Sequence, residues 1–178
     1  DGSVQSSLID ITNGNVSADN ETLQFVEQLH KQRETMRFEP LKYEHLAQMA
    51  EIEQEAFDTP WTKAMFIPEL YSAEAFYTVG VRGDEVICYG GFHKVLDEGH
   101  ITNIAVKHTA RGRGIGKFLL ATLISKAREV GVEHMTLEVN VNNAPAIHLY
   151  ESYGFKGAGI RKKYYNNRDD ALIMWLDV

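Results

Sequence analysis

Three alternating glycines place the strongest constraint on the fold of this 178-residue chain. Gly112, Gly114 and Gly116 stand between a strand-like apolar segment that ends at Val106 and a long amphipathic stretch that continues to Val130. Glycine lets backbone N–H groups approach a ligand closely, and the start of a helix carries a partial positive charge. A strand, a glycine loop and a helix in this order therefore predict an anion site, best suited to a pyrophosphate.

Two common nucleotide-binding motifs do not fit this loop. A P-loop ending in Lys117 requires glycine at position 111 and Ser or Thr at position 118, where Arg111 and Phe118 stand. A dinucleotide-binding fingerprint requires glycine or alanine at position 117 or 119, and these positions hold Lys117 and Leu119. A plain tight turn is the alternative, and it is less favoured because the strand, the loop and the helix agree with one another.

Periodicity and turn residues predict alternating strands and helices from Met36 onward. The expected strands are 36–41, 76–82, 85–95, 100–106 and 134–139, followed by a hairpin of 155–165 and 171–178. The expected helices are 43–57, 59–71, a long one ending at 130, and 143–153. The second helix is expected to begin with Thr59 as its cap and Pro60 in its first position. This order is typical of an α/β fold with a mixed sheet.

The first 35 residues differ in composition from the rest. Residues 1–20 are rich in Ser, Asn, Asp and Gly and are expected to form a flexible arm. Asn20 is a candidate cap for a short helix. The apolar stripe of that helix consists of Leu23, Phe25, Val26 and Leu29. We therefore expect an extension at 1–35, compatible with a cloning or processing remnant because the chain starts at Asp1, and one domain at 36–178.

Charge and cysteine content narrow the possible functions. The chain has 18 Lys and Arg against 25 Asp and Glu, a net charge of −7, which argues against sequence-independent nucleic-acid binding and favours a basic partner. It has neither a membrane-spanning apolar run nor a visible signal peptide. Its one cysteine, Cys88, excludes an internal disulfide, fits a reducing cytoplasm and is expected to be a packing residue. The seven histidines show no metal-ligand spacing, so we expect no metal.

Three polar residues follow the loop in positions of interest. Glu138 lies on the opposite face of its predicted strand from Leu137 and Val139, near the strand end where ligands bind in open α/β sheets. Asn143 suits a helix N-cap, and Tyr150 lies two turns into that helix. Each has a plainer interpretation, as a solvated strand residue, a simple cap and a core tyrosine. Their position after the glycine loop makes them candidate site residues.

Two segments resemble one known family. The Arg-x-x-Gly-x-Gly pattern of Arg111, Gly114 and Gly116 resembles the acyl-CoA pyrophosphate loop of the GNAT acetyltransferase superfamily. Leu-Glu-Val at 137–139 and Asn-x-x-Ala-x-x-Leu-Tyr-x-x-x-Gly-Phe at 143–155 resemble its RimI group, the ribosomal-protein alanine N-acetyltransferases. The resemblance covers about residues 36–178. It implies a GNAT-type mixed, mostly antiparallel sheet flanked by helices.

The resemblance also implies a reaction and roles for single residues. It implies an acetyl-CoA-dependent N-α-acetyltransferase of the cytoplasm that acts on the N-terminal alanine of a ribosomal small-subunit protein. Glu138 would be the general base and Tyr150 the general acid. The cofactor-binding residues would be Ile104, Ala105, Val106, Arg111, Gly112, Arg113, Gly114, Ile115, Gly116, Lys117 and Asn143. Candidate walls of the acceptor groove, each equally suited to the core, are Phe57, Trp61, Tyr164 and Tyr165.

One departure from the family pattern affects the substrate. The family usually has Arg and Ser where this chain has Asn140 and Asn142. An acetyltransferase of small amines, such as a polyamine, an amino acid or an aminoglycoside, therefore stays open as an alternative, and a non-catalytic acyl-CoA-binding module is a less favoured one. The expected partner is the N-terminus of a basic protein or peptide. We expect no direct contact with nucleic acid or membrane, and a monomer or weak dimer.

Overall fold

The computed structural model describes residue 20, residues 23–24, residue 27 and residues 35–178. The predicted arm at 1–19 and the stripe residues Phe25, Val26 and Leu29 lie outside the described residues, whereas the described positions between 20 and 27 are helical. The compact unit that holds the candidate site comprises Phe38–Val81 and Glu85–Val178. The boundary near residue 35 stays a prediction.

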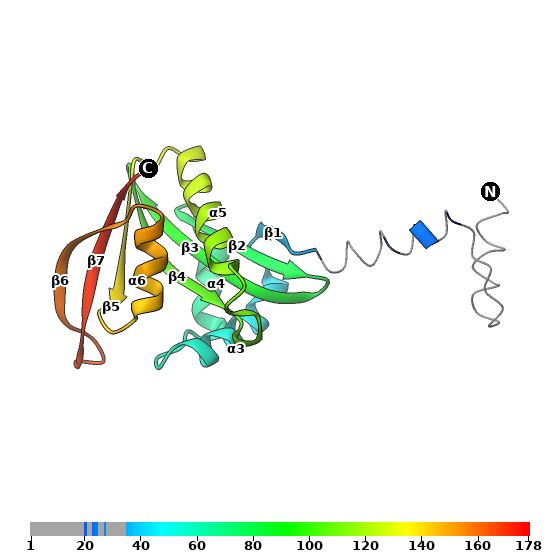
Figure 1. Cartoon of the computed structure of the whole chain (residues 1–178), viewed down its shortest axis with the longest axis horizontal. Helices are drawn as coiled ribbons and strands as arrows, with labels where there is room; N and C mark the ends of the chain where they lie inside the picture. The colour runs from blue at the N-terminus through cyan, green and yellow to red at the C-terminus, as the bar shows by residue number, and fades with distance from the viewer. Residues whose placement is uncertain (1–19, 21–22, 25–26, 28–34) are drawn as a thin grey trace. The chain divides into compact units, whose positions relative to one another are not determined.

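A sheet of seven strands in the described part of the chain has the order β1-β2-β3-β4-β5-β7-β6 (Figure 1). Strands β4 and β5 run parallel, whereas β3–β4, β5–β7 and β6–β7 are antiparallel pairs. The predicted mixed, mostly antiparallel sheet is therefore confirmed. The strand bounds are β1 Arg37–Pro40, β2 Ala75–Arg82, β3 Glu85–Val95, β4 Glu98–Val106, β5 His134–Asn140, β6 Lys156–Tyr165 and β7 Asp169–Asp177.

Helices cover both faces of this sheet. They are α3 Leu46–Ala56, α4 Lys63–Tyr71, α5 Ile115–Glu129 and α6 Ala144–Ser152, with 3-10 turns η1 Tyr43–His45 and η2 His108–Ala110. Apolar residues of α3 and α4 pack with Tyr89 and Ala105 in one buried cluster, and those of α5 and α6 pack with Leu137 and Met174 in the other. No helix in the described residues is long and apolar enough to cross a membrane.

Most predicted element bounds differ from the observed ones by one or two residues, but α4 begins later than predicted. Thr62, not Thr59, is the N-cap, and its hydroxyl accepts a hydrogen bond from the backbone N–H of Met65 at 3.4 Å. The backbone N–H of Trp61 donates instead to the Glu53 carboxylate at 3.2 Å, which keeps this residue in the loop. Both threonine side chains are able to cap a helix, and this tertiary contact decides which of them is the N-cap of α4.

Strands β4 and β5 separate before they end. They pair at three positions, the last of which joins His100 to Thr136. Beyond it, β4 continues to Val106 and β5 to Asn140 without pairing to each other. This separation opens the sheet between the two strands at the place where the candidate site residues lie.

A bulge in β4 decides which of its side chains face which layer. Two adjacent residues of β3 oppose Asn103 and Ile101, so Thr102 is an extra residue in β4. As a result, Ile101 and Ile104 both pack against the α5–α6 cluster. Asn103 and Ala105 face the opposite layer, where Asn103 contacts a residue of α3 and Ala105 joins the α3–α4 cluster.

Candidate active site

A cleft of about 780 Å³ lies where β4 and β5 separate. Its walls come from the end of α3 and the loop after it, from β4, β5 and α6, and from the β6–β7 hairpin. Ala105, Val106 and the glycine loop lie outside this lining. Eight of the residues selected from the sequence line the cleft: Phe57, Trp61, Ile104, Glu138, Asn143, Tyr150, Tyr164 and Tyr165.

Glu138 presents its carboxylate to the cleft with both oxygens engaged. Its strand alternates as predicted, with Leu137 and Val139 buried on the other face. Oε2 lies 2.5 Å from Nε2 of His100, and Oε1 lies 3.4 Å from a guanidinium nitrogen of Arg161. The side chain is only 10% exposed. A carboxylate held in this way has a fixed orientation, which a solvated strand residue would lack.

Tyr150 lines the same cleft from α6. The residue is 9% exposed, and its ring stacks edge-to-face on Phe155 with the ring centres 5.7 Å apart. Its hydroxyl has no hydrogen-bond partner among the described residues. Burial, with a smaller contribution from Tyr165, raises the pKa of Tyr150 to about 12. The phenol therefore keeps its proton at neutral pH.

The glycine loop has the conformation of an anion cradle. Gly112 and Gly114 both have φ of +78°, in the left-handed region that side chains disfavour. Gly114 is the N-cap of α5, and no side chain caps this helix. The backbone N–H groups of Ile115, Gly116 and Lys117 lie in the first turn, where a helix offers no carbonyl partner. These amides are available to a negatively charged ligand.

Two contacts join the loop to the rest of the site. The guanidinium Nε of Arg111 donates to the carbonyl of Val106 at 3.0 Å, which ties the loop to the end of β4. The hydroxyl of Tyr153 on α6 donates to the carbonyl of Lys117 at 2.8 Å. The start of α5 and the cleft-lining α6 are therefore held together.

Asn143 caps α6, as predicted. Its side-chain oxygen accepts a hydrogen bond from the backbone N–H of Ala146 at 3.3 Å.

Of the four aromatic candidates, two lie at the rim of the cleft and two form part of its wall. Phe57 is 41% exposed and Tyr164 is 47% exposed, so both lie at the rim. Trp61 and Tyr165 are half-buried. Trp61 packs on Phe66 with ring centres 5.2 Å apart, and Tyr165 packs on Tyr164 at 5.0 Å. Trp61 therefore belongs to the core as well as to the cleft.

The cleft is acidic. Its described lining residues include Glu53, Asp58, Glu138 and Asp169 and no Lys, Arg or His. The side-chain amide of Asn140 donates to Asp169 at 3.2 Å and, together with Arg168, lowers the pKa of this carboxyl below its ordinary value. Asp169 therefore stays charged at the cleft, which favours a cationic acceptor over an anionic one.

Glu53 is a buried part of the site that the sequence analysis missed. Its side chain is 1% exposed and accepts three hydrogen bonds. The N–H of Trp61 donates to Oε2, while the Tyr89 hydroxyl at 2.6 Å and the Asn103 amide at 2.7 Å donate to Oε1. Burial and the nearby Glu53 raise the pKa of Tyr89 far above its ordinary value. One carboxylate thus joins α3, the loop after it, β3 and the bulged β4.

We expect Glu53→Ala to lower the free energy of unfolding by about 3 kcal/mol or more, because each orphaned buried donor costs about 1–3 kcal/mol. Urea unfolding measures this loss. Glu51→Ala, an exposed position on the same helix, is the control and should stay within about 0.5 kcal/mol of the parent. Equal stabilities of the two variants would contradict the role given to Glu53.

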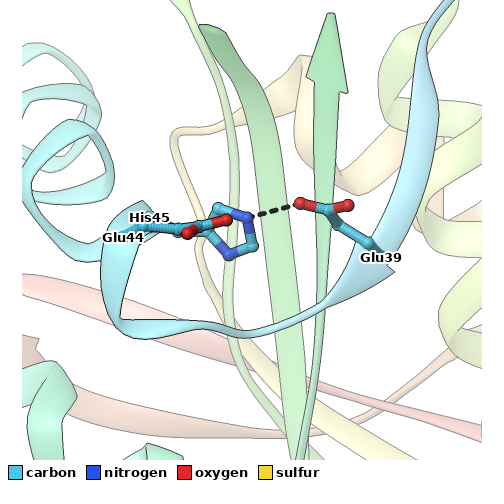
Figure 2. A group of neighbouring side chains, drawn as sticks. All are labelled: Glu39, Glu44 and His45. Carbon is cyan, nitrogen blue, oxygen red and sulfur yellow. Dashed lines mark hydrogen bonds and ion pairs between the residues drawn. The ribbon is translucent and has the colours of Figure 1, made fainter. Parts of the chain in front are cut away.

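Two groups of described side chains have the ligand types and spacing for a metal ion: Glu39, Glu44 and His45, and Asp97, Glu133 and His134. In the first group, shown in Figure 2, Nε2 of His45 lies 2.7 Å from Glu39, and its Nδ1 accepts the backbone N–H of Lys42 at 3.0 Å. Both ring nitrogens therefore have protein partners, and this histidine, 3% exposed, braces the start of η1. The expectation of no metal stays a prediction.

Cys88 is the packing residue that was predicted. It is fully buried in β3, and burial raises the pKa of its thiol to about 12. A thiol of this kind is not a nucleophile at neutral pH.

Residues 46–155, which hold the glycine loop, Glu138 and Tyr150, match the family described as the acetyltransferase (GNAT) family. The chain belongs to the GNAT acetyltransferase family. It is accordingly an acetyl-CoA-dependent N-acetyltransferase, and the predicted resemblance to the RimI group is confirmed by its relatives.

Three similar proteins illustrate this relationship. A Bacillus subtilis protein provisionally named ribosomal protein bS18-alanine N-acetyltransferase is 38% identical over 140 residues, 78% of this chain and 93% of the relative. The crystal structure of the ribosomal-protein-S18-alanine N-acetyltransferase from Escherichia coli has a TM-score of 0.75 and 34% identity, over 80% of this chain and 94% of that one. Arabidopsis thaliana NAA60, solved with acetyl-CoA, shares the fold at a TM-score of 0.74 and 20% identity, over 81% of this chain and 99% of that one.

Proposed function

We propose that this enzyme acetylates the α-amine of an N-terminal alanine on a ribosomal small-subunit protein. The observation that carries the proposal is the match to a relative named for this reaction. The relative is 38% identical to this chain, and the match covers 93% of its length. The cleft supports it, because Glu138 and Tyr150 line one acidic cavity. We expect the enzyme to act on a basic N-terminus as a monomer or weak dimer.

The acceptor end of the cleft suits an α-amine. The α-amine of a peptide has an ordinary pKa of about 7.7–8.0, against about 10.4 for lysine. Because the pKa of the α-amine lies close to neutral pH, only a modest lowering of this pKa is needed to present it as the free amine. The Glu138 carboxylate is a sufficient base for the ammonium proton, directly or through a water. The surrounding carboxylates Asp58 and Asp169 favour the incoming ammonium form.

The glycine loop, outside the cleft, suits the pyrophosphate of acetyl-CoA. The positive φ of Gly112 and Gly114 and the uncapped first turn of α5 leave backbone amides available, and a Cβ at either glycine would meet nothing within 4 Å. The loop from Arg111 to Lys117 would hold the pyrophosphate, and Asn143 with the β4 segment 104–106 would line the path of the acyl arm. Acetyl-CoA supplies the thioester acetyl group.

These residues account for each proton that moves during the acetyl transfer. Glu138 first passes the ammonium proton to solvent, so that the nitrogen reacts as the free amine. This nitrogen forms a bond to the acetyl carbonyl carbon, the carbon–sulfur bond breaks, and the nitrogen gives its surplus proton to Glu138. The Tyr150 phenol gives its proton to the departing thiolate sulfur, and the proton held by Glu138 returns through solvent to the phenolate. A backbone N–H of the segment 104–106 stabilises the oxyanion. Holding the reactants together accounts for up to roughly 7–11 kcal/mol of the barrier.

Gly114→Ala should raise the KM for acetyl-CoA at least several-fold, because a left-handed φ of +78° is about 1–2 kcal/mol less favourable for a side chain. The matched control is Gly131→Ala at the other end of α5, where φ is +79°. Both variants should lose about the same stability in urea, and only Gly114→Ala should bind acetyl-CoA more weakly. Equal KM values for the two variants would contradict a cofactor role for the loop.

A small-amine substrate is the second candidate. The supporting observation is Asn140, which stands where the family usually has Arg and which is bonded to Asp169 instead of being free to hold a peptide. Mass spectrometry of an alanine-starting small-subunit protein incubated with enzyme and acetyl-CoA tests the first candidate. We expect one acetyl group on the N-terminal alanine. Acetylation of lysines alone, or of a free polyamine alone, would contradict it.

A further inference from the structure

His100 is the closest partner of the proposed base, and neither the sequence nor the reaction outlined above gives it a role. It lies at the last position where β4 pairs with β5, opposite Thr136, so the next residue on that face of β5 is Glu138. This geometry places Nε2 of His100 2.5 Å from Oε2 of Glu138. The imidazole is 43% exposed, while the carboxylate is 10% exposed. The histidine thus connects a nearly buried base to solvent.

Charged and titratable groups on β6 and β3 surround this pair. On β6, Arg161 lies 3.4 Å from the other oxygen of Glu138. On β3, His93 is the cross-strand neighbour of His100, and its own Nε2 lies 2.5 Å from Glu69. On the cleft side, burial, Tyr164 and, to a smaller extent, Glu138 raise the pKa of Tyr165 to about 12.

The chemistry of the contact fixes the position of the histidine proton. An ionised carboxylate only accepts hydrogen bonds, so a neutral His100 must carry its proton on Nε2 and donate it to Glu138. Nδ1 then has a lone pair and no partner in the described part of the chain. A solvent proton that binds there converts the neutral imidazole into an imidazolium.

We propose that His100 is a positioning residue that holds Glu138 for proton abstraction and reduces its basicity when His100 is protonated. In the neutral state, the Nε2–H bond orients the carboxylate and leaves its remaining lone pairs for the acceptor amine. In the protonated state, the imidazolium and Arg161 place two positive charges against one carboxylate. Glu138 then accepts the proton of an ammonium less readily. This inference rests on the proposed role of Glu138 as the base.

Two variants separate orientation from titration. His100→Gln keeps a side-chain N–H donor but does not titrate, and His100→Ala removes both properties. The matched control is His134→Gln on β5, because His134 also pairs with a carboxylate, but that carboxylate, Asp177 at 2.8 Å, does not line the cleft, whereas Glu138 does. kcat and KM are measured for each variant from about pH 5 to about pH 8, the range in which histidine titrates.

We expect His100→Ala to lower kcat about tenfold with little change in the acceptor KM, a fraction of the contribution of a general base. His100→Gln should keep most of the activity at the alkaline end, and its kcat should fall less steeply toward acid than that of the parent. His134→Gln should follow the parent. The proposal would be overturned by an unchanged kcat in His100→Ala. It would also be overturned if kcat of His100→Gln fell as steeply toward acid pH as that of the parent.

A second readout needs no acceptor, so it separates this inference from the proposed function. Imidazole nitrogen NMR of the free enzyme reports the tautomer and the titration midpoint of His100. We expect the Nε2–H tautomer, a lower midpoint in Glu138→Gln, where a negative partner is lost, and a higher midpoint in Arg161→Gln. An Nδ1–H tautomer, or midpoints that do not respond to either variant, would show that the pair is not coupled as proposed.

Discussion

Replacing Glu138 by Gln is expected to lower kcat for an alanine-starting peptide by about 100- to 10,000-fold, the usual contribution of a general base. Glutamine has nearly the same size and still accepts the hydrogen bond of His100, but it does not take a proton. The KM for acetyl-CoA should change little, because Glu138 lies on β5 and not on the glycine loop. Initial rates of free-thiol release measure both parameters.

The matched control is Glu151→Gln on α6, where the side chain is 55% exposed and does not line the cleft. This variant should keep the parental rate. Residual activity of the Glu138 variant should be greatest with acceptors whose amines have low pKa values, because these need the least help to lose a proton. A loss of less than about tenfold with every acceptor would show that Glu138 is not the base.

Tyr150→Phe is expected to lower kcat by about 100-fold or more, because the departing thiolate loses its proton donor. The variant keeps the ring and its packing on Phe155, and the hydroxyl has no protein partner in the described residues, so stability should stay within about 0.5 kcal/mol of the parent. Burial raises the pKa of Tyr150 to about 12, so the parent should not lose this proton as the pH rises from neutral to about 10.

Tyr71→Phe, on an 83% exposed ring of α4, is the control for the loss of a phenol hydroxyl. It should have the parental rate. If Tyr150→Phe also had the parental rate, Tyr150 would be a core tyrosine only. If neither the parent nor the variants turned over any acceptor although acetyl-CoA bound, the chain would be the acyl-CoA-binding module that the sequence left open.

The glycine loop and the orientation of Glu138 could be predicted because each depends on local pattern. The alternation of β5 places Glu138 opposite Leu137, and glycines before an amphipathic helix indicate left-handed backbone and free amides. The same local reasoning failed at α4, where Thr59 and Thr62 have equal cap chemistry. There, a hydrogen bond from Trp61 to Glu53, eight residues away in sequence, decides the start.

The rest of the site depends on how the strands pair with one another, which no local sequence pattern indicates. The bulge at Thr102 changes the layer that the following β4 residues face, so Asn103 meets Glu53 from 50 residues away. His100 meets Glu138 only because β4 and β5 pair in parallel with a particular register, across 38 residues. Glu53 occupies an ordinary helical position in the sequence, and its burial follows from three donors on other elements.

The initial rate of free-thiol release from acetyl-CoA with three acceptors tests the proposed acceptor most directly. These are a short basic peptide that starts with alanine, the same peptide with a blocked N-terminus, and a polyamine. We predict release with the free peptide and none above background with the blocked peptide or the polyamine. Release with the polyamine but not with the free peptide would contradict the peptide α-amine as the acceptor and transfer the function to small amines.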